Sequence, residues 1–266
     1  MPVECSVAVE KMGQEQFHAI DKVVMGQAFA VHNALGRFCD EPIYQDELAQ
    51  RCRSEGLDLK REALVRVSHG SFAKPYYLDL FVERGVVYEL KAVEALSGTH
   101  EKQLINYLLL TDLCHGKLVN FRPRSVESRF VSTTLRRNDR MAFAINDAAW
   151  RGEDAGSRAL AEKLRALLAD WGAFLDINLY REALLHFFCG AESGIHSVEI
   201  TVDNRIVGTQ KMCLLDQETA WHLSAIRQHF TSYETHIRRL LNCTKLRRMH
   251  WINFANQTIA LKTLMK

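Results

Sequence analysis

Three charged residues in the first half of this 266-residue chain have the types and spacing of a phosphodiesterase site. Asp79 interrupts an apolar run, and Glu89 and Lys91 stand two residues apart in the next such run. Because side chains alternate along a strand, Glu89 and Lys91 share one face, and two carboxylates and an ammonium group can converge across neighbouring strands. Carboxylates are hard oxygen ligands for Mg²⁺, which can hold a phosphate oxygen and activate a bound water.

The expected metal ligands are Asp79, Glu89 and the backbone carbonyl of Leu90, with Mg²⁺ as the metal and Mn²⁺ as the alternative. Lys91 would orient the attacking water or offset the negative charge that develops on the phosphate. A cross-strand ion pair on a solvated sheet face has the same spacing, and the three residues alone favour that simpler interpretation.

Further polar residues change this balance. Gln103 and Tyr107 lie one helical turn apart on one face of the helix expected at residues 99–113. Glu41 stands at the expected start of another helix, where the helix dipole stabilises a carboxylate. Taken singly, these are surface side chains and a cap. Their combination with the charged residues favours a site.

Hydrophobic periodicity predicts the elements that must position these side chains. Apolar residues at spacings of three and four between Phe17 and Leu35 predict a helix that ends near Gly36, and Pro42 begins a second helix that stops before Gly56. The remaining order is three strands, a helix and two strands: 63–67, 76–83, 86–93, 99–113, 117–121 and 129–133.

The second half of the chain repeats this order. G-R-F-C-D-E-P-I-Y at 36–44 aligns without gaps with G-A-F-L-D-I-N-L-Y at 172–180, and later matches keep an offset of 133 to 136 residues. The repeat predicts a duplicated domain, with copies at residues 1–138 and 139–266 and a junction within the polar segment 138–156. Two unrelated α/β domains that share common residues are the alternative.

The second copy lacks the charged residues of the first. Met212, His222 and Ser224 stand at the positions of the aspartate, the glutamate and the lysine, so no pair of metal ligands remains. An offset of 136 puts Arg239 and Cys243 at the positions of the glutamine and the tyrosine. These changes are typical of a copy retained for its fold and not for catalysis, and we expect the histidine to be structural.

Basic residues gather near the last predicted helix of the second copy. They can bind nucleic-acid phosphates or can form a solvated helix end, and the sequence leaves both possibilities open. The predicted nucleic-acid-binding residues are Arg238, Arg239, Lys245, Arg247 and Arg248.

Composition excludes several classes of protein. The net charge of +2 neither requires nor excludes nucleic acid as a partner. The seven cysteines include no C-x-x-C pair, which indicates a reducing compartment without structural zinc. The first residues lack a signal sequence, and no apolar run is long enough to span a membrane. We therefore expect a cytoplasmic protein without membrane contact.

Taken together, the motifs resemble a known superfamily. Asp79-x₉-Glu89-x-Lys91 followed by Gln103-x₃-Tyr107 resembles the PD-(D/E)XK nucleases and the Q-x-x-x-Y element of their exonuclease branches. Over residues 20–135, H-N-A-L-G, E-x-x-Y, Y-E-L-K-A-V-E and V-N-F resemble the small bacterial "GxxExxY" proteins. The chain departs from these patterns where phenylalanine at position 38 replaces the glycine of the name motif and leucine at position 78 replaces the proline of the Pro-Asp pair.

The resemblance implies two tandem restriction-endonuclease-like α/β domains, each a small mixed sheet flanked by helices. It implies a Mg²⁺-dependent nuclease with DNA favoured over RNA, in which the first copy cuts and the second supports the fold or binds nucleic acid. The alternative is a non-catalytic nucleic-acid-binding or interaction protein on a nuclease scaffold, and either a monomer with two pseudo-dimeric copies or a homodimer is compatible. The catalytic or supporting residues carried over are Asp79, Glu89, Lys91, Glu41, Gln103 and Tyr107.

Overall fold

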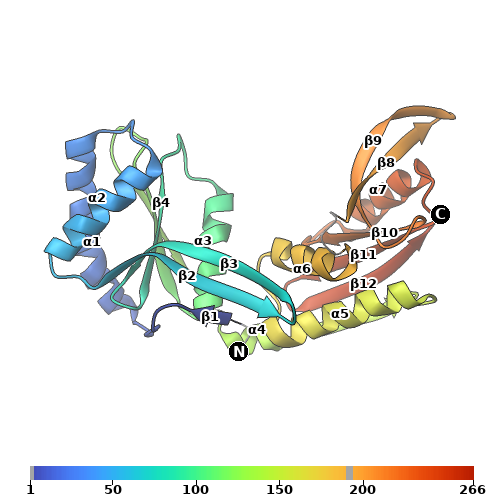
Figure 1. Cartoon of the computed structure of the whole chain (residues 1–266), viewed down its shortest axis with the longest axis horizontal. Coiled ribbons are helices and arrows are strands. Elements are labelled where there is room, and N and C mark those ends of the chain that lie inside the picture. Colours follow the sequence, from blue (N-terminus) through green and yellow to red (C-terminus); the bar gives the residue numbers. More distant parts are fainter. Residues whose placement is uncertain (1–2, 190–193) are drawn as a thin grey trace. The chain divides into compact units, whose positions relative to one another are not determined.

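The chain forms two compact units, residues 1–137 and 138–266 (Figure 1). The computed structural model describes residues 3–189 and 194–266. Each unit contains a six-stranded mixed sheet flanked by helices, which confirms the predicted fold class. Within the described ranges, no helix has both the length and the apolar character needed to cross a bilayer.

The sheet of the first unit has the order β1-β2-β3-β4-β5-β6, and only β4 and β5 are parallel. Helices α1 (Gln14–Leu35) and α2 (Glu41–Ser54) pack on one face, and α3 (Gly98–Thr111) lies on the other side of the sheet (Figure 1). The strands are β1 (Val3–Cys5), β2 (Leu59–His69), β3 (Phe72–Val82), β4 (Val86–Lys91), β5 (His115–Asn120) and β6 (Glu127–Ser132).

The parallel pair determines where side chains can meet. Because α3 connects β4 to β5, both strands end at the same edge of the sheet, and Lys91 lies opposite Asn120. The Asn120 side chain fixes the chain as it leaves β4, since its Oδ1 accepts from Val93 N at 3.0 Å and its Nδ2 donates to Val93 O at 2.7 Å. The segment that follows β4 is therefore held against the end of β5.

A tyrosine holds the connection between α1 and α2. Gly36 ends α1 with φ +70°, a conformation that glycine adopts without strain. The Tyr44 hydroxyl donates to Gly36 O at 2.9 Å and accepts from Cys39 N at 3.1 Å. Its ring stacks on Phe121 with the centroids 4.5 Å apart, so the start of α2 is fixed relative to the end of β5.

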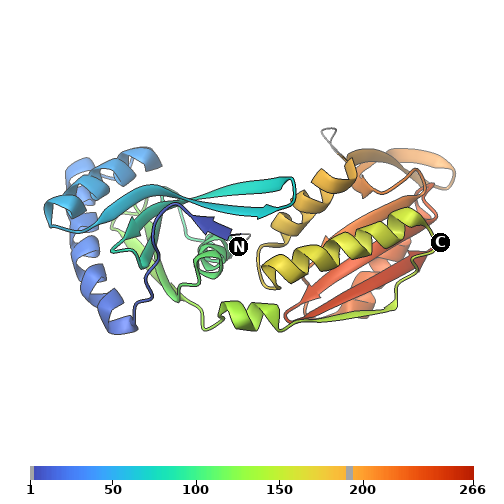
Figure 2. The same ribbon diagram turned by 60° about the horizontal axis from the view of Figure 1, so that its bottom comes forward.

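The second unit has the sheet order β7-β12-β11-β10-β9-β8, with β10–β11 and β7–β12 parallel. Figure 2 shows α5 and α6 across one face of this sheet. The helices are α4 (Arg137–Met141), α5 (Ala155–Trp171), α6 (Ile177–Cys189) and α7 (Phe230–Asn242). The strands are β7 (Ala144–Ala149), β8 (Ile195–Val202), β9 (Arg205–Leu214), β10 (Thr219–Ser224), β11 (Arg248–Ala255) and β12 (Thr258–Met265).

Three elements differ from the prediction. The strands β1 and β7 and the short helix α4 were not expected, and β7 lies inside the segment that was predicted to be a junction. Both strands are edge strands, and β7 is largely exposed, so neither has the apolar alternation that would predict it.

The two units share local hydrogen bonds as well as element order. Tyr180 repeats the clamp of the first unit, since its hydroxyl donates to Gly172 O at 2.5 Å and Gly172 has φ +75°. Asn253 bonds both backbone groups of Ile226 at 3.0 Å, as its counterpart does in the first unit. These shared contacts support the predicted duplication, which stays a proposal.

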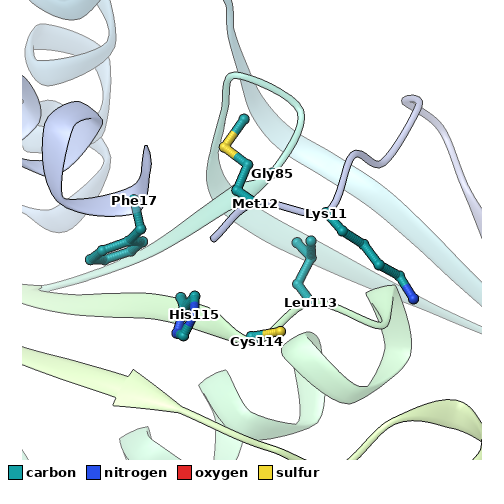
Figure 3. Close-up of a pocket in the computed structure, with 7 residues that line it drawn as sticks. All are labelled: Lys11, Met12, Phe17, Gly85, Leu113, Cys114 and His115. Carbon is teal, nitrogen blue, oxygen red and sulfur yellow. The ribbon is translucent and has the colours of Figure 1, made fainter. Parts of the chain in front are cut away.

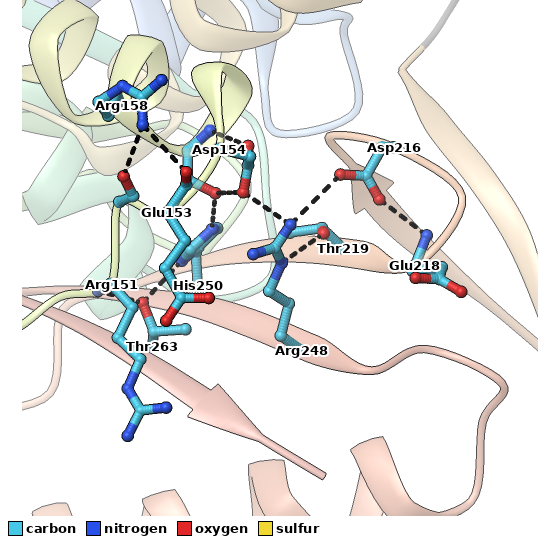
Figure 4. A network of polar contacts seen from close by, with 12 residues as sticks. Arg151, Glu153, Asp154, Arg158, Asp216, Glu218, Thr219, Arg248, His250 and Thr263 are labelled. Atoms are coloured by element: carbon cyan, nitrogen blue, oxygen red, sulfur yellow. Dashed lines mark hydrogen bonds and ion pairs between the residues drawn. The ribbon is translucent and has the colours of Figure 1, made fainter.

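A polar network inside the second unit surrounds His250 (Figure 4). The side chain is fully buried, with Nε2 2.7 Å from Ser157 Oγ and Nδ1 3.0 Å from Thr263 Oγ1. Asp154 caps α5 by accepting from Ser157 N at 2.7 Å and pairs with Arg248 at 2.6 Å. Burial, together with the Arg248 charge, lowers the pKa of His250 to about 4.

This low pKa predicts acid sensitivity of the second unit. The unfolded chain binds a proton near pH 6.5 and the folded chain only near pH 4, so the free energy of unfolding should fall by about 3 kcal/mol between pH 7 and pH 4. All four tryptophans lie in this unit, so urea unfolding followed by tryptophan fluorescence reports on it alone. His250→Gln should remove most of this pH dependence. An equal slope in the variant would contradict the assignment.

Candidate active site

Asp79, Glu89 and Lys91 meet where β3 and β4 separate. The backbone pairing of β3 with β4 ends at Leu80 and Tyr88. Beyond this pair, the Leu90 N–H donates to the side chain of Asp79, at 2.7 Å from Oδ2. Lys91 Nζ lies 2.7 Å from Glu89 Oε1 and 4.0 Å from Asp79 Oδ2. Glu89 is 1% exposed, so the group is an interior cluster and not an ion pair on a solvated face.

Glu41 brings a third carboxylate to the same ammonium group. It is the first residue of α2, and its Oε1 lies 3.7 Å from Lys91 Nζ. The clamp formed by Tyr44 determines where α2 begins, and it therefore also determines where this carboxylate lies. The structure thus brings Glu41, one of the residues carried over from the motif, close to Lys91.

Gln103 and Tyr107 approach from α3. Gln103 Nε2 donates to the Tyr107 hydroxyl at 3.0 Å, and the Tyr107 ring meets Tyr76 edge-on at 6.1 Å. Burial raises the pKa of Tyr107 to about 12, and the nearby charge of Glu89 adds to this effect. The two predicted helix residues therefore form one hydrogen-bonded pair beside the carboxylates.

Burial makes the negative charges of this cluster unfavourable. It raises the pKa of Asp79 to about 6, although the Lys91 charge and the Leu90 N–H act in the opposite direction. Burial and the Asp79 charge raise the pKa of Glu89 to about 8 and outweigh the bond from Lys91. For Lys91, burial favours the neutral amine, but Glu89, Asp79 and Glu41 together raise its pKa, so it stays an ammonium group.

These oxygen atoms fit a hard divalent cation. Glu89 Oε2 is buried and has no hydrogen-bond partner, which is a costly state unless a cation or proton satisfies it. The N–H and C=O of one residue point to the same side of a strand, so the Leu90 carbonyl faces the Asp79 side. Across residues 3–189 and 194–266, no group of three or more His, Cys, Asp or Glu side chains is arranged to hold a metal. The predicted ligand set has only two such side chains, since its third ligand is a backbone carbonyl.

The corresponding place in the second unit holds no carboxylate. Trp221 pairs with Cys213 as Tyr88 pairs with Leu80, which puts Met212, His222 and Ser224 at the predicted positions. His222 Nε2 lies 2.7 Å from the Tyr233 hydroxyl, and burial lowers its pKa. The Ser224 hydroxyl donates to Asn253 Oδ1 at 2.7 Å. All these contacts are internal hydrogen bonds.

The structure favours an alignment of α3 with α7 that differs from the predicted alignment by three residues. Thr111 and Thr244 both donate from Oγ1 to the carbonyl three residues earlier, and Leu104 and Ile237 are both buried. These matches keep an offset of 133, as in the strands. The positions of the glutamine and tyrosine are then taken by His236 and Leu240 and not by Arg239 and Cys243. The periodic apolar residues of a helix permit more than one register, which explains the difference between the two alignments.

Four of the five basic residues predicted to bind nucleic acid are in ion pairs, although all except Arg248 are exposed. Arg248 lies inside the network of Figure 4, paired with Asp154 and bonded to Thr219 Oγ1 at 2.7 Å. Among the described residues, only Arg239 of the five has no ion pair and is exposed. The other pairs are Arg238 with Glu234, Lys245 with Glu199 and Arg247 with Glu218.

A narrow pocket in the first unit lies away from the carboxylates (Figure 3). It is lined by seven residues, including Met12, Phe17, Gly85 and His115, and has no room for a water molecule. Gly85 precedes the first residue of β4, whereas Glu89 and Lys91 end that strand. The pocket therefore plays no part in the candidate site.

Sequence reasoning missed two residues that shape the site. Asn120 is fully buried and holds Val93, and its only sequence signal was its place in the V-N-F motif. Glu62 has a positive φ of 46° where the β2–β3 pairing breaks opposite Asp79, and its charge adds to the rise in the Asp79 pKa. No pattern in the sequence predicts this irregularity.

Comparison with known proteins agrees with this geometry. Residues 18–131 match the family model described as the PD-(D/E)XK nuclease superfamily. No match was found to a curated protein or to a solved structure. The matched range begins within α1, ends within β6 and contains all six predicted catalytic and supporting residues. Over residues 18–131, the chain is therefore similar to the PD-(D/E)XK nuclease superfamily.

Proposed function

We propose that the first unit is a metal-dependent nuclease that hydrolyses phosphodiester bonds of nucleic acid, with DNA favoured as the substrate. The observation that carries the proposal is the convergence of Asp79, Glu89 and Lys91, with a buried Glu89 oxygen that lacks a partner. A solvated ion pair would not leave a buried carboxylate oxygen unsatisfied. Catalytic sites, in contrast, commonly hold such groups.

Each residue has a distinct role in this proposal. Asp79, Glu89 and the Leu90 carbonyl would hold Mg²⁺, with Mn²⁺ as the alternative, and the metal would polarise the phosphate and activate a water when bound. Lys91 remains charged, so it acts as a hydrogen-bond donor that stabilises negative charge on the phosphate and not as a base. Glu41 positions the Lys91 ammonium from the opposite side.

Gln103 and Tyr107 contribute as a pair. Their hydrogen bond leaves the second N–H of the Gln103 amide for another acceptor, and Gln103 is partly exposed. A phosphate or a base of the substrate strand is a suitable acceptor. Because Tyr107 is buried and remains protonated, it orients the amide and is not itself a general base.

We propose that the second unit is a duplicated copy that supports the fold. The residues at its former site are satisfied by internal hydrogen bonds, and four of its five clustered basic residues are in ion pairs. These contacts favour a structural role over nucleic-acid binding.

The first prediction concerns Lys91. Lys91→Ala should reduce Mg²⁺-dependent cleavage of labelled DNA by at least about a hundredfold, because a transition-state contact is lost. Its matched control is His222→Ala in the second unit, which should leave cleavage unchanged. Single- and double-stranded DNA and RNA should be tested with Mg²⁺, Mn²⁺ or EDTA. Equal cleavage by Lys91→Ala and the parent would refute the assignment, and binding without any cleavage would favour a non-catalytic nucleic-acid-binding protein.

The second prediction concerns pH and metal. The folded pKa of Glu89, about 8, lies above its ordinary value, so the neutral form is favoured in the fold and stability is lost as pH rises through 8. Without metal, the first unit should melt at a lower temperature at pH 9 than at pH 6, whereas Glu89→Gln should show a smaller decrease.

Calorimetry can measure both the melting and the binding of Mn²⁺. Affinity for Mn²⁺ should rise between pH 6 and pH 8, because protons on Asp79 and Glu89 compete with the metal, and Glu89→Gln should bind weakly at every pH. Unchanged Mn²⁺ affinity in Glu89→Gln would exclude this carboxylate as a ligand.

A further inference from the structure

An aromatic side chain stands exposed beside the candidate site. Phe38, in the connection between α1 and α2, is 75% exposed, more than any other large apolar side chain in the described part of the chain. The guanidinium of Arg37 lies over its ring, 5.0 Å from the centroid. Single exposed apolar side chains are common at protein surfaces, so the inference depends on the surroundings of this ring and not on its exposure alone.

The loop that carries Phe38 is rigid and belongs to the site. Tyr44 bonds Gly36 O on one side of Phe38 and Cys39 N on the other, which fixes the backbone around it. Three residues further on, Glu41 lies 3.7 Å from Lys91 Nζ. The exposed ring is thus held at a fixed place only a few residues from the carboxylate cluster.

Positive charge without carboxylate partners lies at the same edge of the sheet. Among the described residues, Arg37, Arg122 and Arg124 form no ion pair. Arg122 and Arg124 follow the end of β5, next to the end of β4 that carries Lys91, and the Arg122 Nε donates to Ala92 O at 3.3 Å. This distribution is the reverse of that in the second unit, where the clustered basic residues are mostly paired.

The second unit provides an internal comparison. The equivalent loop repeats the tyrosine clamp, but Ala173 stands in place of Arg37 and is buried, and Phe174 is only partly exposed. Phe174 also has a φ of 72°, unlike Phe38. Of the two equivalent connections, only the one in the unit with the carboxylates therefore carries a highly exposed aromatic side chain and an arginine.

On the basis of the proposed nuclease function, we propose that Phe38 stacks on an unpaired base of the substrate while Arg37 and Arg124 contact its phosphates. An aromatic face and uncompensated arginines along a backbone path are the two features by which proteins hold single-stranded nucleic acid. A base inside a duplex offers no free face to a side chain that projects from a loop. The substrate is then a single strand or the single-stranded end of a duplex.

Binding measured in EDTA tests this assignment separately from cleavage. The full-length parent should bind a fluorescent thymidine oligonucleotide more tightly than an abasic strand of equal length or a blunt duplex. Phe38→Ala should weaken binding of the thymidine strand by roughly 5- to 100-fold and leave the abasic strand unaffected. Phe38→Trp should retain affinity, and its added fluorescence should be quenched on binding. The matched control Phe230→Ala, an exposed phenylalanine of the second unit, should behave as the parent.

Salt dependence tests the arginines. Arg37→Gln and Arg124→Gln should each reduce the slope of log affinity against log salt by about 0.7 for a single strand, whereas the ion-paired Arg247→Gln should not. Equal binding of the thymidine strand by Phe38→Ala and the parent, or no binding of any oligonucleotide, would overturn the proposal. Phe38-dependent binding without cleavage would overturn only the nuclease function. Cleavage of blunt duplex unaffected by Phe38→Ala would keep the nuclease function and overturn the stacking role.

Discussion

The burial of two neighbouring carboxylates, Asp79 and Glu89, is the constraint that shapes the candidate site of the first unit. Asp79 and Glu89 lie in an environment that opposes their charges, and the Lys91 ammonium lies close to both. Lys91 does not remove the cost, because the Glu89 pKa stays raised and one of its oxygens has no partner. An arrangement that is unfavourable for the isolated fold is common at sites whose residues were selected for binding and chemistry.

Keeping such a cluster together requires a rigid frame, and the frame comes from ordinary packing. The parallel β4–β5 pair brings the end of one strand beside the end of the next, and Asn120 and Tyr44 fix the segments that leave them. These hydrogen bonds are short and partly buried. They hold Glu41 and Lys91 in place without themselves touching a substrate.

Much of this arrangement follows from the sequence for identifiable reasons. The helices from Phe17 and from Pro42 and the strands that carry Asp79 and Glu89 have clear periodicity, and their positions agree with the structure within a few residues. That Glu41 belongs to the site was inferred from the motif alone, and its contact with Lys91, 50 positions away, was not predicted. The edge strand β7 and the positive φ of Glu62 were not predictable, because tertiary pairing and not local preference produces them. The ion pair of Arg248 with Asp154 was also not predictable, because the sequence shows which residues are charged but not which residues pair with them.

The two units together separate contacts that hold the fold from contacts that hold the site. Two hydrogen bonds occur in both units: the tyrosine hydroxyl bonds the glycine that ends the preceding helix, and an asparagine bonds the segment that follows β4 or β10. Each removes a buried unsatisfied backbone group, so its loss would cost stability in any version of the fold. The carboxylates and the lysine occur only in the first unit, and serine, histidine and methionine satisfy the same positions in the second without buried charge. Because the second unit folds without this charged cluster, the fold does not require it. The persistence of the cluster in the first unit is therefore best explained by a ligand that compensates its charge.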